Sequence, residues 1–364
     1  MKILFAGGGT GGHISPAVAI GEYAIKNIKS TEIAFVGRKS GEENNAIIKR
    51  GYKLFEIDLS GFKRKITKDN IKNVFKLIKA MKESKKILKN FKPDAVIATG
   101  GYVSYPVLKC AQKMKIPCYI HESNAYPGLV TRLLSGKAKY VFLNREEAKE
   151  HLRKTKNVLT VGNPINSEFG KIKRAEARKK LKIENNEKLV VSFGGSGGSL
   201  KMNEVILSLM NRLNKENSDI KFIHASGKKY FSVFSEKYQE LCHENAIQKL
   251  VAYIDNMPTL LAAADLVISR SGAMSCTEIA ASGVPSILIP SPNVAANHQY
   301  KNALSFEKNG AALIIEEKEL SEKRLYEEIF TLLYDKEKLN EMKKSAFKLY
   351  NKNAAKQICN HLIT

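Results

Sequence analysis

The sequence predicts an α/β protein with two doubly wound parallel-sheet domains, and three observations support this prediction. Short apolar runs alternate with stretches of helical periodicity, which is typical of a parallel sheet covered on both faces by helices. This alternation breaks at Gly162-Asn163-Pro164 and then starts again. At 364 residues the chain is also longer than one ordinary hydrophobic core supports. We therefore expect two domains joined near residue 164.

The expected elements are placed by the period of the apolar residues. In the first domain we expect strands at 2–6, 32–36, 54–59, 95–99, 118–121, 140–143 and 158–162, with helices at 16–29, 69–91 and 105–114. In the second domain we expect a helix at 174–181 and strands at 188–193, 221–225, 250–254, 266–270, 286–290 and 311–315. The segment from about 335 to 364 is expected to be helical and is rich in lysine.

Composition indicates a globular protein of a reducing compartment. The N-terminal strand leads directly into glycines, which leaves no room for a signal-peptide core, and no apolar stretch approaches the ~20 residues that span a bilayer. The five cysteines, at positions 110, 118, 242, 276 and 359, lack metal-type spacing, so we interpret them as reduced core thiols.

Positive charge is concentrated in one segment of this basic chain, whose net charge is +24. Residues 63–92 contain twelve Lys or Arg against Asp69 and Glu83. Apolar residues recur there at helical spacing among lysines: Ile71, Val74, Phe75, Ile78 and Met81, with Lys72, Lys76, Lys79 and Lys82. Such a helix can lie on an anionic membrane surface, or it can pack on a sheet with its lysines in water. No aromatic platform or helix-turn-helix pattern favours nucleic acid.

Three glycine turns follow directly after expected strands. They are Gly7–Gly12, which leads into His13, then Thr99–Tyr102, and finally Gly194–Gly198. Glycine lets the backbone approach a ligand closely, and the helix that follows directs N–H groups at an anion. Two turns in the first half and one in the second predict a cleft lined from both sides.

The first turn also satisfies the dinucleotide-binding pattern, with glycines at positions 7, 9 and 12. The second strand ends in Arg38 rather than in the acid that holds a ribose, which suits an NADP-dependent dehydrogenase. That alternative leaves the turns at 100 and 194 unexplained.

The second half carries a denser group of polar residues. Ser269-Arg270-Ser271-Gly272-Ala273 ends a strand and opens a helix that contains Thr277 and Glu278. A carboxylate at this place can accept two hydrogen bonds from a ribose diol, and the helix N-terminus suits a diphosphate. After the next strand, His298 and Gln299 can bind sugar hydroxyls.

Taken in order, these motifs closely resemble those of the bacterial lipid I N-acetylglucosaminyltransferases of glycosyltransferase family 28. The resemblance spans residue 2 to about 315 and includes His121-Glu122-Ser123-Asn124, Gly162-Asn163-Pro164 and the Gln299-Tyr-x-Asn-Ala run. It implies a GT-B fold with an interdomain cleft. Residues 1–163 would form an acceptor- and membrane-facing domain, with a terminal helix at about 343–364 packing back on it. Residues 164–342 would bind UDP-GlcNAc.

The resemblance also implies an activity, namely inverting transfer of N-acetylglucosamine from UDP-GlcNAc to lipid I, which forms the β-1,4 linkage of lipid II in peptidoglycan synthesis. By resemblance, Ile254 would hold the uracil, Glu278 the ribose, and Ser196 the phosphate side. The other donor-binding residues implied are Thr10, Gly11, Gly12, Asn124, Ala273, Met274, Ser275, Cys276, Thr277 and Gln299. The acceptor diphosphate would lie against Gly9, Gly100, Gly101 and Tyr102.

The sequence departs from the family pattern at two places. Asn166 follows Ile165 where relatives often carry an arginine that helps to hold the nucleotide, and Gly197 stands where a glutamine is usual.

Inversion at the sugar requires a base for the acceptor hydroxyl. His13 is the first candidate, with hydrogen bonding to the acceptor as the alternative role. Glu122 is the second candidate, with bracing of its loop as the alternative. We expect no metal and no cofactor, because helix dipoles and loop amides can stabilise the departing UDP.

The resemblance further implies a membrane patch of Ile71, Lys72, Phe75, Lys76 and Lys79 that docks on anionic lipid. The protein would then be peripheral on the cytoplasmic face of the bacterial plasma membrane, with other cell-wall synthesis proteins as partners. Alternative hypotheses are a diacylglycerol galactosyltransferase, a UDP-GlcNAc 2-epimerase, and a membrane adaptor without activity.

Overall fold

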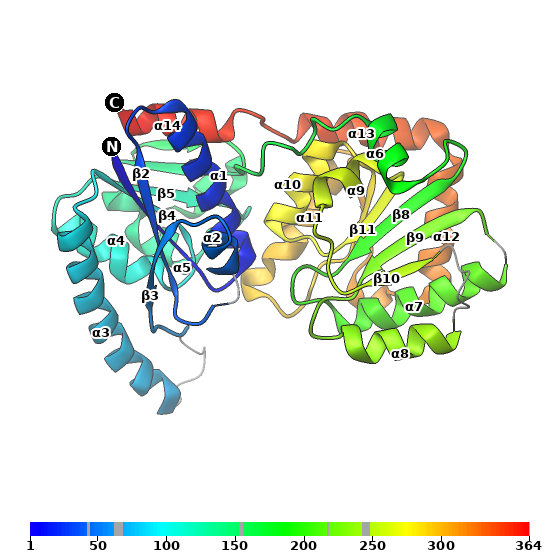
Figure 1. The fold of residues 1–364 in the computed structure, drawn as a ribbon, viewed down its shortest axis with the longest axis horizontal. Helices are drawn as coiled ribbons and strands as arrows, with labels where there is room; N and C mark the ends of the chain where they lie inside the picture. The colour runs from blue at the N-terminus through cyan, green and yellow to red at the C-terminus, as the bar shows by residue number, and fades with distance from the viewer. Residues whose placement is uncertain (42–43, 62–67, 153–155, 217, 242–247, 364) are drawn as a thin grey trace. The chain divides into compact units, whose positions relative to one another are not determined.

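The structure, a computed structural model, describes residues 1–41, 44–61, 68–152, 156–216, 218–241 and 248–363. It divides into two compact units (Figure 1). Unit 1 comprises Met1–Asn166 and Asn351–Thr364, and unit 2 comprises Ser167–Tyr350. The chain therefore passes from unit 1 to unit 2 a few residues after the Gly162-Asn163-Pro164 break and returns near its end.

Unit 1 contains, in its described residues, a seven-stranded parallel sheet of order β3-β2-β1-β4-β5-β6-β7. Its strands are β1 (Lys2–Gly7), β2 (Glu32–Arg38), β3 (Lys53–Ile57), β4 (Ala95–Gly100), β5 (Cys118–Glu122), β6 (Tyr140–Leu143) and β7 (Val158–Thr160). Its helices are α1 (Gly11–Asn27), α2 (Asn45–Ile48), α3 (Lys68–Phe91), α4 (Ser104–Lys113), α5 (Leu129–Leu134) and α14 (Ala354–Ile363), with short 3-10 turns η2 (Ser135–Lys137) and η3 (Glu146–His151).

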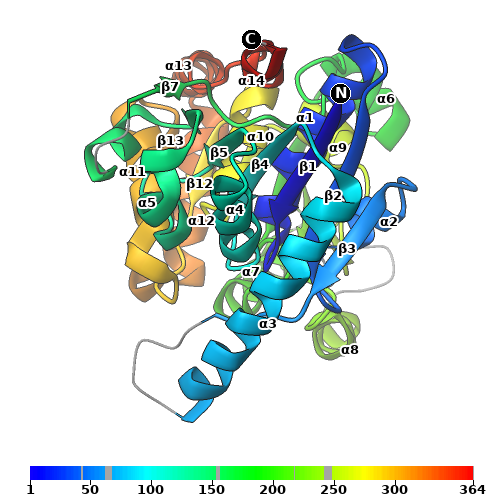
Figure 2. The same cartoon turned by 90° about the vertical axis from the view of Figure 1, so that its left-hand side faces the viewer.

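Alternation along β1 divides the core of unit 1 between the two faces of the sheet. Leu4 and Ala6 belong to the core beneath α3 and α4, whereas Ile3 and Phe5 belong to the core beneath α1 and α14. Successive side chains of a strand point to opposite faces, and both faces of a parallel sheet are covered. Figure 2 shows α3 and α4 in front of this sheet.

Unit 2 contains, in its described part, a six-stranded parallel sheet of order β10-β9-β8-β11-β12-β13. Its strands are β8 (Lys188–Phe193), β9 (Ile220–Ala225), β10 (Lys249–Val251), β11 (Leu266–Ser269), β12 (Ser286–Leu288) and β13 (Ala312–Ile314). Its helices are α6 (Arg174–Leu181), α7 (Leu200–Lys215), α8 (Phe231–Leu241), α9 (Met257–Ala263), α10 (Ala273–Ser282), α11 (His298–Lys308), α12 (Glu322–Tyr334) and α13 (Lys336–Lys348), with 3-10 turns η4 (Ala295–Asn297) and η5 (Glu317–Glu319). On one face of this sheet, α7 and α12 pack over Val190, Phe222 and Ile268.

The C-terminal segment differs from the single helix expected at about 343–364. It forms two helices in different units, because each has its own packing partner. In α13, the ring of Phe347 packs directly against Gly283 at the end of α10, where an added Cβ would lie 2.1 Å from the ring. In α14, Ile358, Cys359 and Leu362 are buried against the α1 side of the first sheet. The part of the expected helix that precedes residue 349 therefore belongs to unit 2.

Candidate active site

Each sheet has one place where the strand order reverses, and the glycine turns lie there. In unit 1 the chain builds outward from β1 to β3 and then restarts at β4 beside β1; in unit 2 it restarts at β11 beside β8. Ligands of open α/β sheets bind at the carboxyl ends of the strands that flank such a switch point. The turns after β1 and β4, and the turn after β8, occupy these positions.

The two glycine turns of unit 1 are packed backbone against backbone. The N–H of Gly8 donates to the carbonyl of Gly100 (3.3 Å). Gly101 has a φ of +83°, and a Cβ added there would lie 1.9 Å from the carbonyl oxygen of Gly8. A Cβ on Gly100 would clash with the His13 ring at 2.6 Å. These contacts require glycine at 100 and 101, and they bring the turn after β4 against His13.

His13 lies in the first turn of α1 and is held by three contacts. Its ring Nδ1 is 2.9 Å from the carbonyl oxygen of Gly8 and 3.4 Å from Oγ1 of Thr10, and its own carbonyl accepts from the Thr99 hydroxyl (2.7 Å). A carbonyl oxygen can only accept, so the contact with Gly8 favours the tautomer with the proton on Nδ1. In that tautomer Nε2 carries the lone pair that a base requires.

Glu122 ends β5 with a buried carboxylate whose two oxygens are both occupied. Oε1 accepts from the backbone and side-chain N–H groups of Asn124 (3.1 and 3.2 Å). Oε2 accepts from the Gly128 N–H (2.9 Å) and the Thr131 hydroxyl (2.7 Å). Four hydrogen bonds to one carboxylate favour the bracing role over the role of base, and they hold Asn124 in place.

The Gly162-Asn163 segment also contacts the end of β5 and the loop that follows it. The ring Nε2 of His121 is 3.1 Å from the carbonyl oxygen of Gly162, and the side-chain amides of Asn163 and Asn144 both donate to the carbonyl of Ser123 (3.3 and 2.8 Å). His121 is fully buried, and this burial lowers its pKa to about 4. Sequence reasoning singled out both motifs but did not show that one anchors the other.

The glycine turn of unit 2 is open at its tip and tight at its base. A Cβ on Gly198 would lie 2.1 Å from the carbonyl oxygen of Ser226, whereas a Cβ on Gly195 or Gly197 would meet nothing within 4 Å. Ser196, between the two open glycines, is exposed. The base of the turn borders a cavity of about 490 Å³ that is also lined by Gln299, Arg270, Tyr230 and Lys201. The structure therefore brings Gln299 and the third glycine turn to one cavity.

Arg270 is a buried residue that hydrogen-bonds several of the segments around this cavity, and the sequence analysis assigned it no role. Its guanidinium donates to the carbonyls of Ile289 and Pro290 (3.1 Å each), to the hydroxyl of Ser199 (2.6 Å), and to the carboxylate of Glu317. Ser199 in turn caps α7 by accepting from the N–H of Met202. The signal in the sequence was an arginine inside the Ser-Arg-Ser-Gly-Ala run, directly after an apolar strand.

A buried polar network lies beneath the same turn. His224 in β9 contacts the Ser192 hydroxyl through Nδ1 (2.7 Å) and the side-chain oxygen of Asn203 through Nε2 (3.0 Å). The Asn203 amide donates to the carbonyl of Ser226 (3.0 Å), the oxygen against which Gly198 packs. Burial lowers the pKa of His224 to about 4. The network joins β8, β9 and α7 under the turn.

The residues expected at the nucleotide lie along α10 and the loop after β10. Desolvation raises the pKa of the Glu278 carboxyl to about 7. Desolvation also raises the pKa of Tyr253, with further contributions from the charges of Glu278 and Asp255, so these groups lie near one another beside Ile254. The side chains of Ala273, Met274, Cys276 and Thr277 are buried, Ser275 is half-buried, and Gly272 at the N-cap of α10 provides no side-chain cap. Any ligand contact of these buried residues would use the backbone of the first turns.

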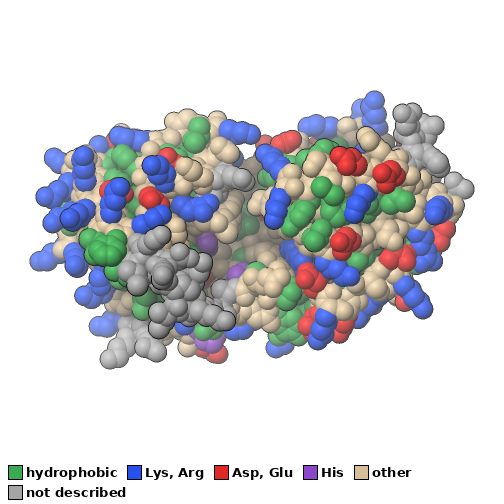
Figure 3. All heavy atoms as spheres, turned by 90° about the horizontal axis from the view of Figure 1, so that it is seen from below, with side chains coloured by type: hydrophobic (Ala, Val, Ile, Leu, Met, Phe, Trp, Pro, Cys, Tyr) green, Lys and Arg blue, Asp and Glu red, His purple; other side chains and the backbone are tan. Residues whose placement is uncertain are grey.

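The exposed surface of α3 is apolar and basic, as its sequence pattern indicates. Val74, Phe75 and Ile78 are 47%, 69% and 51% exposed. Lys76 pairs with Asp58 (2.9 Å), and the largely exposed Lys79 lies 3.9 Å from Glu83. The side chains of Ile71 and Lys72 lie outside the described residues. In Figure 3, hydrophobic side chains lie beside lysines on the part of unit 1 that includes α3.

Within the described residues, no helix is long and apolar enough to cross a membrane. No group of three or more His, Cys, Asp or Glu side chains in the same part of the chain is arranged to hold a metal ion. Four cysteines, at positions 110, 118, 276 and 359, are buried and form no disulfide bond, and Cys242 lies outside the described residues.

Two parallel-sheet domains, each with glycine turns at its switch point, define a two-domain, doubly wound α/β protein. Residues 3–143 match the model of the glycosyltransferase family 28 N-terminal domain, and residues 189–358 match the family 28 C-terminal domain. The chain belongs to glycosyltransferase family 28. Both the predicted fold class and the resemblance inferred from the sequence are confirmed, and the dehydrogenase interpretation is set aside.

Individual relatives agree with this assignment. A UDP-N-acetylglucosamine–N-acetylmuramyl-(pentapeptide) pyrophosphoryl-undecaprenol N-acetylglucosamine transferase of Acetivibrio thermocellus is 42% identical over 98% of this chain and 96% of its own. The crystal structure of Acinetobacter baumannii MurG matches with a TM-score of 0.76 at 25% identity, over 100% of this chain and 99% of that one. A UDP-GlcNAc 2-epimerase of Neisseria meningitidis shares the fold at a TM-score of 0.70 and 17% identity, covering all of both chains.

Proposed function

We propose that this chain transfers N-acetylglucosamine from UDP-GlcNAc to the 4-hydroxyl of undecaprenyl-diphospho-N-acetylmuramoyl-pentapeptide, and that it inverts the anomeric carbon. The observation that carries the proposal is the pair of switch-point sites of unlike chemistry. Unit 1 presents a histidine with backbone turns, and unit 2 presents a desolvated carboxylate with an open glycine turn and Gln299. The names of the full-length relatives at about 42% identity support the same reaction.

In this proposal, unit 2 holds the donor. Glu278 accepts from the ribose diol, the backbone of Ile254 binds the uracil, and the first turn of α10 together with Ser196 faces the diphosphate. Helix N-termini and loop amides stabilise negative charge without a cation. Gln299 and Asn124 position the sugar, together with Thr10, Gly11 and Gly12. Asn166, in place of an arginine, leaves the nucleotide without that side-chain contact.

In the same proposal, unit 1 holds the acceptor and activates it. The turn residues Gly9, Gly100, Gly101 and Tyr102 face the acceptor diphosphate. The oxygen of the acceptor 4-hydroxyl attacks C1 of the donor sugar while its proton passes to Nε2 of His13. The bond from C1 to the UDP oxygen breaks, and UDP leaves with that electron pair. The carboxylate of Glu122 acts by holding Asn124.

We also propose that the protein is peripheral on the cytoplasmic face of the plasma membrane and docks through α3. Exposed Phe75 and Ile78 beside Lys79 would meet acyl chains and anionic headgroups respectively. Phe75→Ser with Ile78→Ser should weaken binding to anionic vesicles and leave UDP binding unchanged. Equal vesicle binding by the variant would favour an α3 whose lysines are merely solvated. Other cell-wall synthesis proteins remain proposed partners.

The test of the proposed reaction is transfer of label from UDP-GlcNAc to a lipid I analogue, with the linkage of the disaccharide determined. Wild type should form a β-1,4 disaccharide, and His13→Ala should lower kcat by about 10²- to 10⁴-fold, the usual contribution of a positioned base. His361→Ala in α14 is the matched histidine control and should retain full activity. No disaccharide from wild type would overturn the proposal. Conversion of UDP-GlcNAc without acceptor would instead favour an epimerase.

A further inference from the structure

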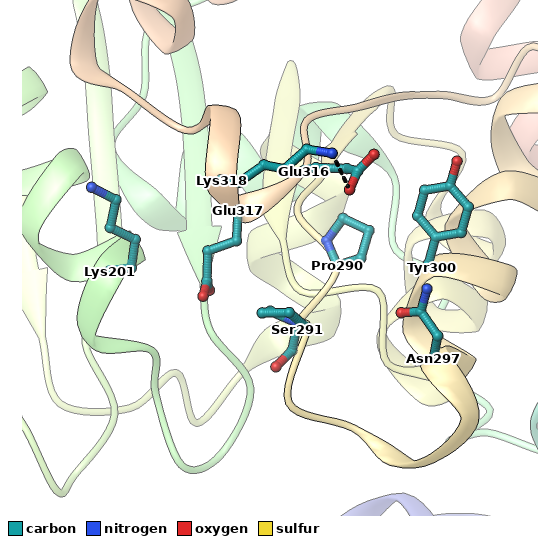
Figure 4. A pocket seen from close by; sticks show the side chains of 9 residues that line it. Lys201, Pro290, Ser291, Asn297, Tyr300, Glu316, Glu317 and Lys318 are labelled. Carbon is teal, nitrogen blue, oxygen red and sulfur yellow. Dashed lines mark ion pairs between the residues drawn. The ribbon is translucent and has the colours of Figure 1, made fainter.

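A second cavity of unit 2 adjoins the one at the glycine turn and has no role in the proposed donor site. It has a volume of about 520 Å³ and shares Lys201, Ser291 and Glu317 with its neighbour. Its remaining lining residues are Pro290, Pro292, Asn297, Tyr300, Glu316 and Lys318. Figure 4 shows Lys201 on one side of the cavity and Tyr300 with Asn297 on the other, separated by Pro290 and Ser291.

The charges around this cavity leave a cation available. Glu317 is engaged by the buried guanidinium of Arg270, and Glu316 pairs with Lys318 at 3.3 Å. In the part of the chain that the structure describes, Lys201 is exposed and makes no ion pair. Lys318 is 71% exposed and holds its partner loosely at the surface. Such a pair contributes little to stability, so Lys318 is free to bind another carboxylate.

The wall shared by the two cavities is held by a hydrogen bond between a side chain and the backbone and by a turn of defined conformation. The side-chain oxygen of Gln299 accepts from the N–H of Ser291 at 2.9 Å, which ties the proposed sugar-binding residue to the edge of the second cavity. Ala296 and Asn297 adopt left-handed φ values of 53° and 52°. Residues other than glycine rarely adopt this conformation, and the surrounding structure must hold them in it. The turn that presents Asn297 therefore has a defined shape.

We infer that this second cavity binds the peptide chain of the acceptor, an inference that rests on the proposed function. In N-acetylmuramic acid the peptide is attached through the lactyl ether on C3, beside the C4 hydroxyl that attacks the donor sugar. The peptide therefore begins next to the donor sugar wherever the rest of the acceptor lies. Five extended residues span at most ~17 Å, so a cavity contiguous with the Gln299 site is within reach.

The lining matches a peptide that carries carboxylates. Lys201 and Lys318 provide ammonium groups for charge-assisted hydrogen bonds to free carboxylates. Tyr300 and Asn297 provide hydroxyl and amide groups for the peptide backbone, and Pro290 and Pro292 offer apolar surface between them.

The experiment compares two acceptors, one with the full pentapeptide and one whose lactyl group ends in a simple amide. We expect Lys318→Gln to raise KM for the pentapeptide acceptor by about tenfold, the effect of losing one hydrogen bond to a charged group. KM for the peptide-free acceptor, KM for UDP-GlcNAc and kcat should not change. Lys215→Gln, at the far end of α7, is the control and should match wild type for both acceptors.

The failures of the two proposals are distinguishable. If wild type glycosylates neither acceptor, the proposed function fails. If wild type transfers normally but KM of the variant rises equally for both acceptors or for neither, the inferred peptide site is wrong. A selective rise in KM for UDP-GlcNAc would assign Lys318 to the donor and would also overturn the inference. Because the Lys318 side chain is 71% exposed, thermal unfolding should be unchanged in the variant, which makes the kinetic comparison valid.

Discussion

The switch points of the two units carry glycine turns that are stabilised by different means. In unit 1 the turns after β1 and β4 hold each other, with Gly101 packed on the carbonyl of Gly8. In unit 2 the base of the turn after β8 packs on the Ser226 carbonyl, which accepts from the Asn203 side chain beside His224, and the tip of the turn is open. The backbone-built site has one permitted shape. The site supported by side chains can vary at its tip while its base stays fixed.

A buried histidine lies beside the candidate site in each unit. The largest expected effect is therefore the loss of stability that acid causes by protonating these two histidines. Burial lowers the pKa of His121 and of His224 to about 4. Between that value and the ordinary pKa of about 6.5, the unfolded chain binds more protons than the folded one. The stability contributed by each histidine is therefore complete above pH 6.5 and is lost as the pH drops toward 4, by about 3 kcal/mol each, and protonation of Glu278, whose pKa is raised to about 7, offsets part of this loss.

Urea unfolding at pH 7, 6 and 5 measures this loss. His224→Gln removes one titrating group, so its stability should start lower at pH 7 but fall less steeply with acid than that of wild type. An identical slope in the variant would show that His224 does not contribute to acid sensitivity.

Gly101→Ala tests the backbone-built site of unit 1. The new Cβ would lie 1.9 Å from the Gly8 oxygen at a φ of +83°, so the turn must open. We expect a loss of about 4 kcal/mol in the free energy of unfolding, since a severe clash adds to left-handed strain. Gly197→Ala in unit 2 is the matched control, where an added Cβ meets nothing within 4 Å and the change should stay within about 0.5 kcal/mol. Similar losses in both variants would remove the distinction between the two turns.

Asn203→Ala tests the side-chain support of unit 2. It leaves Nε2 of His224 and the Ser226 carbonyl without the Asn203 side chain, while Nδ1 of His224 keeps the Ser192 hydroxyl, and this should cost about 2 kcal/mol in the free energy of unfolding. KM for UDP-GlcNAc should rise as well, because the turn at 194–198 rests on this network. Asn214→Ala, further along α7, should change neither quantity. A variant at 203 that lost stability with an unchanged KM would limit the network to a structural role.

Glu278 gives the smallest expected effect. Desolvation raises its pKa to about 7, so the carboxylate that we assign to the ribose becomes protonated as the pH falls from 8 to 6. KM for UDP-GlcNAc should rise about threefold over that range in wild type, because a hydrogen bond to a charged acceptor is weakened. In Glu278→Gln, KM should be higher at pH 8 and independent of pH. A pH-dependent KM in the variant would assign the titration to another group.

Much of the fold was accessible from sequence, because the signals that define it are local. The described strands coincide with the apolar runs of the sequence, and each of the three glycine turns directly follows a strand. The positions of these turns at the edges of the sheets could therefore be derived from the sequence alone. The terminal segment was the exception, because whether α13 or α14 packs on a given unit depends on contacts such as Phe347 with Gly283, which no local pattern contains.

The candidate site was accessible only in part. His13, Glu278 and Gln299 stand in motifs and could be named. The bracing of Glu122 by Gly128 and Thr131, and the reach of Arg270 from β11 to Glu317, depend on three-dimensional contacts between segments separated in the chain. The second cavity combines loops after β12 and β13 with the start of α7, so it arises from strand order rather than from any one motif.

The central claim is that unit 2 binds the nucleotide and that unit 1 activates the acceptor. Calorimetric titration of UDP into wild type, Glu278→Ala and His13→Ala tests it most directly. We predict that UDP binds wild type and His13→Ala with equal affinity and binds Glu278→Ala at least about tenfold more weakly, the loss of a ribose contact. Weakened UDP binding in His13→Ala, with wild-type affinity in Glu278→Ala, would contradict the account.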